Sequence, residues 1–171
     1  MRLPADDSGG VGRLRRGFAW AADGLAWFGA ALMAVVTLWI SYGVVARYAF
    51  RAPDALVTEA TALLLVPIAF LGLAHAFKSD ALPRVTLLLD VLPGPVKRAL
   101  DIFNLMLMAA IGVFFATVAV KAVSRTWRNG SVSNVIEWPE FWLWIPVALA
   151  FVVFIGLAMI RLAENFLGGE R

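Results

Sequence analysis

Hydrophobic and polar positions divide the chain into four long apolar stretches separated by shorter polar segments. No Asp, Glu, Lys or Arg occurs in Leu25–Val45, Ala60–Phe77, Ile102–Val120 or Phe141–Ile160. A helix rises about 1.5 Å per residue, so about 20 residues cross the ~30 Å hydrocarbon core of a bilayer. Because backbone polar groups in lipid must be satisfied within the segment, each stretch is predicted to be a transmembrane helix.

The remaining segments complete the predicted plan. Residues 1–17 are expected to form an N-terminal tail, 18–166 a single four-span membrane domain, and 167–171 a C-terminal tail. Residues 84–92 are too few to cross a bilayer, and their apolar side chains fall on one helical face, which is typical of a helix lying in the membrane surface. The fold class is therefore an all-α integral membrane protein with four transmembrane helices and a short interfacial helix between the second and third.

Composition agrees with a membrane domain and offers little for catalysis. Hydrophobic residues make up 61% and charged residues 16%, and there is no cysteine, which excludes disulfides and thiolate sites. The single histidine, His75, has no neighbouring cluster of carboxylates that could complete a zinc site. We expect no enzyme activity, cofactor, metal or nucleic-acid partner, and attribute the basic pI to loops that face anionic lipid.

Charge between the stretches predicts how the chain sits in the membrane. The segments 1–24, 78–101 and 161–171 hold ten of the fifteen lysines and arginines, and the two intervening loops hold the other five. Because cytoplasmic loops of membrane proteins are enriched in Lys and Arg, both termini are expected in the cytoplasm.

Small residues recur along three of the stretches and predict close helix packing. Without a hydrophobic drive in lipid, small side chains allow the dispersion contacts that hold helices together. These rows either pack the four helices on one another or contact a second chain; they comprise Ala22, Ala26, Ala30 and Ala34 in the first stretch, Ala69, Gly72 and Ala76 in the second, and Ala109, Gly112, Ala116 and Ala119 in the third.

Two charged positions suggest specific partners. Asp23 lies near one end of the first stretch and is expected to reach water or to pair with Arg15 or Arg16. Arg47 and Glu59 carry opposite charges on either side of a short loop and are predicted to face each other. Such a pair, if exposed, contributes only about 0–1 kcal/mol.

An ordered set of short motifs gives the sequence a family resemblance. The run Arg47-Tyr48-Ala49-Phe50-Arg51-Ala52-Pro53 is followed by Glu59 and Phe70-Leu71-Gly72, then by Arg84-Val85 with Leu87-Leu88, Leu92-Pro93 and Ile145-Pro146. In this order the motifs resemble the small membrane subunit, of DctQ type, of tripartite ATP-independent periplasmic (TRAP) transporters. The chain departs from the family pattern at Ala60, where a second acidic residue is usual, at Leu82-Pro83, where His-Ile is usual, and at Thr86, where an aspartate is usual.

The resemblance implies a non-catalytic scaffold subunit in a bacterial inner membrane. It would brace a separate, large multi-pass permease subunit for sodium-driven uptake of an organic acid, of dicarboxylate type, delivered by a periplasmic binding protein. Membrane lipids would be its other neighbours. The resemblance gives a structural or partner-contact role to Arg47, Tyr48, Phe50, Pro53, Glu59, Gly72, Arg84, Pro93 and Pro146.

Two other readings remain open from the residues alone. The chain could be a self-sufficient four-span transporter or channel acting as a homo-oligomer, which needs a polar path that the apolar stretches do not offer. It could also be a membrane-embedded enzyme, which the lack of ligand and nucleophile clusters disfavours.

Overall fold

The computed structural model is all-α and describes residues 10–50, 55–81, 94–133 and 135–167. Its helices are α1 (Gly10–Phe50), α2 (Ala55–Leu71), α3 (Leu73–Lys78), α5 (Gly94–Asn129) and α6 (Phe141–Leu167). Four segments are long and apolar enough to cross a membrane, α2 and α3 together forming the second, which confirms the predicted four-span plan. The predicted interfacial helix at 84–92 lies outside the described residues.

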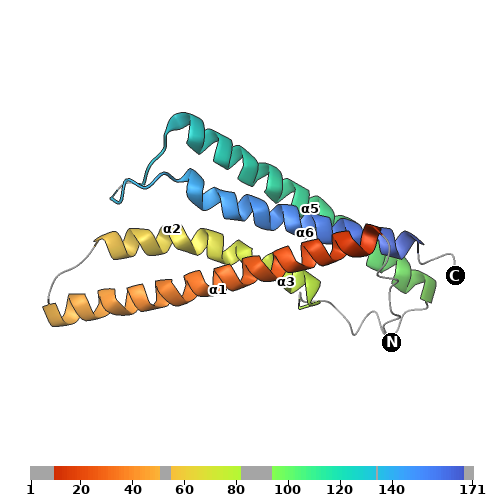
Figure 1. Cartoon of the computed structure of the whole chain (residues 1–171), viewed down its shortest axis with the longest axis horizontal. Helices are drawn as coiled ribbons and strands as arrows, with labels where there is room; N and C mark the ends of the chain where they lie inside the picture. Colours follow the sequence, from red (N-terminus) through yellow and green to blue (C-terminus); the bar gives the residue numbers. More distant parts are fainter. Residues whose placement is uncertain (1–9, 51–54, 82–93, 134, 168–171) are drawn as a thin grey trace.

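The helices form two antiparallel pairs that converge at one end of the molecule. Figure 1 shows α1 beside α2 and α5 beside α6, with the pairs close together near the chain termini and apart at the opposite end. We call the first the terminal end and the second, where α1 ends and α2 begins and where residues 130–133 and 135–140 lie, the loop end. Because α6 packs against every other helix described, it is the central element of the fold.

Charged residues bound an apolar length on each helix that matches a bilayer. Between Asp23 and Arg47 on α1, a helical rise of 1.5 Å per residue gives about 34 Å without a charged side chain. By the same rise, the corresponding lengths are about 27 Å on α2–α3, about 29 Å on α5 and about 30 Å on α6. All four agree with the ~30 Å hydrocarbon core, so the flanking charges form one belt at each end.

The buried core is concentrated toward the terminal end. One cluster there joins α1, α3, α5 and α6 through Ala22, Ala74, Phe77, Leu105, Val153, Phe154, Leu157 and Ala158. A smaller cluster between α5 and α6 meets α2 through the rings of Phe70, Phe115 and Phe151, whose centroids lie 5.2–6.3 Å apart. Toward the loop end, by contrast, the two pairs are far apart, so helix packing there is largely within each pair (Figure 1).

The buried row of α1 repeats every seven residues. Ala22, Gly29 and Val36 are buried, and Gly43 is half-buried. A Cβ atom added at Gly29 would lie 3.0 Å from the Leu71 side chain, and one added at Gly43 would lie 2.7 Å from the Val57 side chain. Glycine is therefore what lets α1 approach α2 this closely. A seven-residue step returns almost to the same side of a helix, as in left-handed helix pairs.

Only part of the predicted small-residue row on α1 packs within the chain. Ala22 is buried, but Ala30 and Ala34 are exposed. A four-residue step overshoots a full turn by about 40°, so a row at that spacing winds off the contact face within three steps. The third-stretch row does pack internally, since Gly112, Ala116 and Ala119 are buried against α6.

Gly112 gives a test of the α5–α6 contact. A Cβ atom there would lie 2.9 Å from Phe154 and 3.0 Å from Ile155, whereas one at Gly24 would meet nothing within 4 Å. We expect Gly112→Leu to destabilise the protein by about 1–3 kcal/mol, the usual cost of overpacking a core. Thermal unfolding in detergent measures the loss, with Gly24→Leu as the control. An equal melting temperature for the two variants would contradict the close contact.

Candidate functional site

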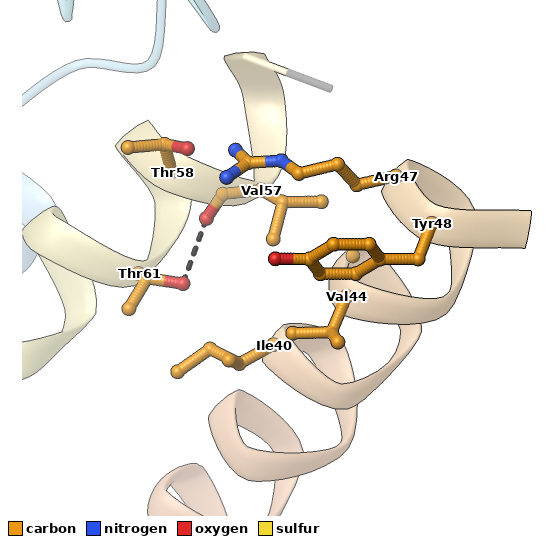
Figure 2. Close-up of a pocket in the computed structure, with 8 residues that line it drawn as sticks. Ile40, Val44, Arg47, Tyr48, Val57, Thr58 and Thr61 are labelled. Carbon is orange, nitrogen blue, oxygen red and sulfur yellow. Dashed lines mark hydrogen bonds between the residues drawn. The ribbon is translucent and has the colours of Figure 1, made fainter. Parts of the chain in front are cut away.

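A groove between α1 and α2 lies at the loop end. It has a volume of about 360 Å³ and is lined by Ile40, Gly43, Val44, Arg47, Tyr48, Val57, Thr58 and Thr61. Figure 2 shows the guanidinium of Arg47 reaching across toward α2 and the Tyr48 ring lying over Val44. The groove therefore combines one cation and several hydroxyl groups with an aliphatic wall.

The polar groups of the groove differ in how they are engaged. Thr61 donates its hydroxyl hydrogen to the carbonyl oxygen of Val57 at 2.7 Å. Within the described part of the chain, neither Arg47, Tyr48 nor Thr58 makes a side-chain hydrogen bond or ion pair. Tyr48 is 81% exposed. These three groups are available to a molecule outside the chain.

Glu59 connects α2 to the segment between α5 and α6. Its Oε2 atom accepts hydrogen bonds from the backbone N–H groups of Val135 and Ile136, at 2.8 and 2.9 Å. A carboxylate that accepts from backbone N–H groups forms charge-assisted bonds, which are stronger than neutral ones. This contact joins the two helix pairs at the end where they are otherwise apart.

The predicted pairing of Arg47 with Glu59 is wrong. In the described residues no ion pair joins them, and the Glu59 carboxylate is used by the loop instead. The adjacent backbone N–H groups of Val135 and Ile136 are held in place by the chain, and the Glu59 carboxylate that they contact is partly buried. Arg47 is an exposed, flexible side chain, and an ion pair with it would gain little in free energy.

The loop that Glu59 contacts is folded on itself. Ser133 N–H donates to the carbonyl of Trp138 at 3.0 Å, and Glu140 N–H donates to the carbonyl of Ser131 at 3.1 Å. Gly130 has a φ of 59°, in the left-handed region that glycine adopts without strain. Glu59 thus binds a turn that also has hydrogen bonds of its own.

At the terminal end, Asp23 of α1 lies between the side chains of Lys78 and His75 of α3. Lys78 Nζ donates to both carboxylate oxygens of Asp23, at 2.7 and 2.6 Å. His75 Nδ1 lies 2.8 Å from Oδ1, and since a carboxylate only accepts, that nitrogen carries the hydrogen. The expectation that Asp23 pairs with Arg15 or Arg16 is corrected, because both lie on its own helix whereas α3 brings Lys78 beside it.

Arg161 fastens α6 to the end of α3. Its Nη1 donates to Asp80 at 2.6 Å and its Nη2 donates to the carbonyl of Lys78 at 2.8 Å. Its guanidinium also lies 4.6 Å from the centre of the Phe77 ring, within the range of a cation–π contact. The Arg161 guanidinium thus contacts Asp80, the Lys78 carbonyl and the Phe77 ring at the carboxyl end of α3. The dipole of a helix also favours a cation at that end.

Two further contacts extend this network, one of them to α5. Arg98 donates to the carbonyl of Asn165 near the end of α6, at 2.8 Å, and Arg15 lies 3.9 Å from Glu164. Among the described residues no group of three or more His, Cys, Asp or Glu side chains could hold a metal ion. The terminal end therefore joins α1, α3, α5 and α6 by charge.

The predicted site residues fall in several places. Arg47 and Tyr48 line the groove, Glu59 holds the loop, and Gly72 separates α2 from α3 with open space beside it. Phe50 ends α1 and Pro146 lies inside α6. Pro53, Arg84 and Pro93 lie outside the described residues.

Sequence reasoning missed the network around Lys78 and Arg161. The signal was present, because the apolar stretches that end at these residues have nearly equal lengths. Charges at the ends of equal spans lie at the same depth and so within reach of one another. Opposite charges at that depth, Asp23 and Lys78, are then natural partners.

Comparison with known proteins gives one finding. A protein-family model, that of the DctQ component of tripartite ATP-independent periplasmic transporters, matches residues 33–168. No curated protein and no solved structure matches the chain. The matched range includes the groove, the Glu59 contact and most of the charged network.

Removing the Glu59 carboxylate should loosen the loop. In Glu59→Ala the N–H groups of Val135 and Ile136 lose their acceptor, so we expect their hydrogen exchange to quicken about tenfold, in line with a charged hydrogen bond of ~1.5 kcal/mol or more. Hydrogen–deuterium exchange with mass spectrometry measures this. Thr58→Ala, one residue earlier on α2, should leave the loop unchanged. If both variants exchange alike, Glu59 does not hold the loop.

The Asp23–Lys78 pair should show measurable coupling. A double-mutant cycle with Asp23→Asn and Lys78→Gln is expected to give about 1 kcal/mol, the upper range for partly exposed ion pairs. The Arg15–Glu164 contact, at 3.9 Å, serves as the weak reference and should couple less. Thermal unfolding of the four variants of each cycle supplies the values. If the coupling energy of Asp23–Lys78 is no larger than that of Arg15–Glu164, the prediction is wrong.

Proposed function

Since the chain belongs to the DctQ family, whose members are the small membrane subunits of tripartite ATP-independent periplasmic transporters, we propose that it is a scaffold that braces the large permease subunit. The large subunit would be a separate multi-pass chain that carries the substrate. A periplasmic binding protein would deliver an organic acid of dicarboxylate type, and a sodium gradient would drive uptake.

The observation that best supports bracing is the amount of apolar surface that the chain leaves uncovered. In the membrane-spanning windows only 11% of residues are buried for α1 and 11% for the α2–α3 span, against 28% for α5 and 39% for α6. The α1–α2 pair thus offers a long apolar face to a neighbour, while α6 is used within the chain.

The small residues on the exposed side of α1 support a protein neighbour on that face. Ala30 and Ala34 are exposed and outside the row that packs within the chain. Small side chains allow a second helix to approach closely, which is how helices associate in lipid. We place the large subunit against this side of α1.

The charge belts support an inner-membrane orientation with both termini in the cytoplasm. The terminal end carries Arg13, Arg15, Arg16, Lys78 and Arg161, so positive charge is concentrated there. Cytoplasmic segments of membrane proteins show this enrichment. The groove and the Glu59 contact would then lie on the periplasmic side, where the binding protein acts.

Co-purification tests the proposed function. The tagged chain, purified in mild detergent from its native membrane, should retain one large multi-pass subunit in equal amount. Vesicles holding both chains should take up substrate with the binding protein and a sodium gradient, and vesicles holding either chain alone should not. Uptake by this chain alone, as a homo-oligomer, would overturn the scaffold role in favour of a self-sufficient transporter.

A substitution at Ala34 tests the placement. We expect Ala34→Phe to reduce the retained large subunit severalfold, because a ring would separate the helices. Ala110→Phe on α5 is the matched control, since Ala110 is also a small exposed residue of a spanning helix. Equal retention in both variants would move the large subunit to another face.

A further inference from the structure

We propose that the groove between α1 and α2 binds the phosphodiester of an anionic phospholipid, with an acyl chain along Ile40 and Val44. This inference requires only that the chain spans a membrane and does not depend on the scaffold role.

The depth of the groove suits a lipid headgroup. Arg47 lies about 36 Å along α1 from Asp23, with no charged residue between, and that distance somewhat exceeds the hydrocarbon thickness. With Asp23 and Lys78 at one boundary of the core, the Arg47 guanidinium lies at the other, where lipid phosphates are found. Cationic and aromatic side chains at this level are typical interface anchors.

The polar side of the groove is suited to a phosphate. Arginine binds phosphate through paired N–H donors in a fixed plane, and the hydroxyl groups of Tyr48 and Thr58 can donate as well. Arg47, Tyr48 and Thr58 all line the groove, and Figure 2 shows the Arg47 guanidinium pointing toward the helix that carries Thr58. In the described part of the chain these three side chains have no hydrogen-bond or ion-pair partner, so a phosphate would not displace an existing contact.

The charge of the lining favours an anionic lipid over a zwitterionic one. Among the described residues that line the groove, Arg47 is the one that carries a charge, and none is a carboxylate that could receive an ammonium group. The nearest acid on α2, Glu59, is engaged by the loop. Phosphatidylglycerol, whose headgroup carries no positive charge, is therefore the expected ligand rather than phosphatidylethanolamine.

The apolar wall distinguishes a lipid from a soluble phosphate or an acidic peptide. Val44 and Ile40 lie about one and two turns below Tyr48 on α1, inside the membrane-spanning segment, and both are exposed. An acyl chain can cover them, whereas a free phosphate or a carboxylate side chain would leave them uncovered. At about 360 Å³ the groove accommodates a headgroup with the start of its chains.

Native mass spectrometry of the full chain, purified in mild detergent and titrated with single lipids, tests the proposal. We expect one phosphatidylglycerol to bind more tightly than phosphatidylethanolamine, and Arg47→Gln to weaken it about tenfold, as expected for loss of a charge-assisted pair. Arg47→Lys should keep part of the affinity, because it retains the charge but not the paired donors. Arg128→Gln, an exposed arginine at the same end, is the control and should bind like the wild type.

Further arms separate the sources of the phosphate and check folding. Glycerol 3-phosphate, which has no acyl chain, should not compete at concentrations that saturate the lipid. Thermal unfolding confirms that each variant is folded, and only variants with wild-type melting temperatures are compared. Equal binding by Arg47→Gln and Arg128→Gln, no preference between the two lipids, or full competition by glycerol 3-phosphate would each overturn the proposal. Loss of a protein partner in Arg47→Gln with unchanged lipid binding would assign the groove to that partner instead.

Discussion

The thickness of the hydrocarbon core is the constraint on which the rest of this structure depends. A charge inside that layer is costly, so each helix carries its charged residues at the two boundaries. On all four spans the charge-free length is close to 30 Å, although the helices themselves range widely in length. Side chains that are far apart in sequence thereby reach the same depth, and the contacts that organise the fold follow from that alignment.

The two ends respond to the constraint in different ways. At the terminal end the helices converge, so Asp23 pairs with Lys78 and Arg161 pairs with Asp80 where the same helices also form the buried core. At the loop end the pairs are apart, and the Glu59 carboxylate reaches the backbone of the 130–140 loop instead of another charged side chain. Every loop has backbone N–H groups that can donate hydrogen bonds, so Glu59 is bound there without a second charged side chain.

Features that depend on long runs of residues could be predicted from the sequence, whereas features that depend on the exact face of a helix could not. The four spans were predictable because lipid requires about 20 consecutive apolar residues, and a run of that length is unambiguous. The α1 contact face was predicted only at Ala22, because a four-residue row and a seven-residue row share that residue and then separate. A four-residue step overshoots one turn by about 40°, whereas a seven-residue step falls about 20° short of two turns, so the two rows drift to opposite sides of the helix. Only the packing of α1 on α2 decides which row is buried.

Partner choice among charges was the least predictable part. Arg47 and Glu59 were matched by sign and by a short loop, but Glu59 has two backbone donors from a segment far along the chain, which no local pattern encodes. Asp23 was compared with arginines on its own helix, although Lys78 lies at the end of a different span of similar length. Equal depth is a better guide than nearness in sequence when helices are antiparallel.

The unequal ends bear directly on the proposed bracing role. A brace must keep its exposed face in a fixed orientation while its neighbour moves, and α1 presents most of that face while burying little of it within the chain. Its orientation is set at the terminal end by Asp23 and at the loop end by close approach of Gly43 to Val57. A phospholipid held by Arg47 would add a third point, at the depth where α1 lacks any ion pair within the described residues. If α1 tilted, the bound phosphate would have to leave the headgroup layer of the membrane. The phospholipid would therefore anchor α1 to the membrane, in addition to the contacts that anchor it to the rest of the chain.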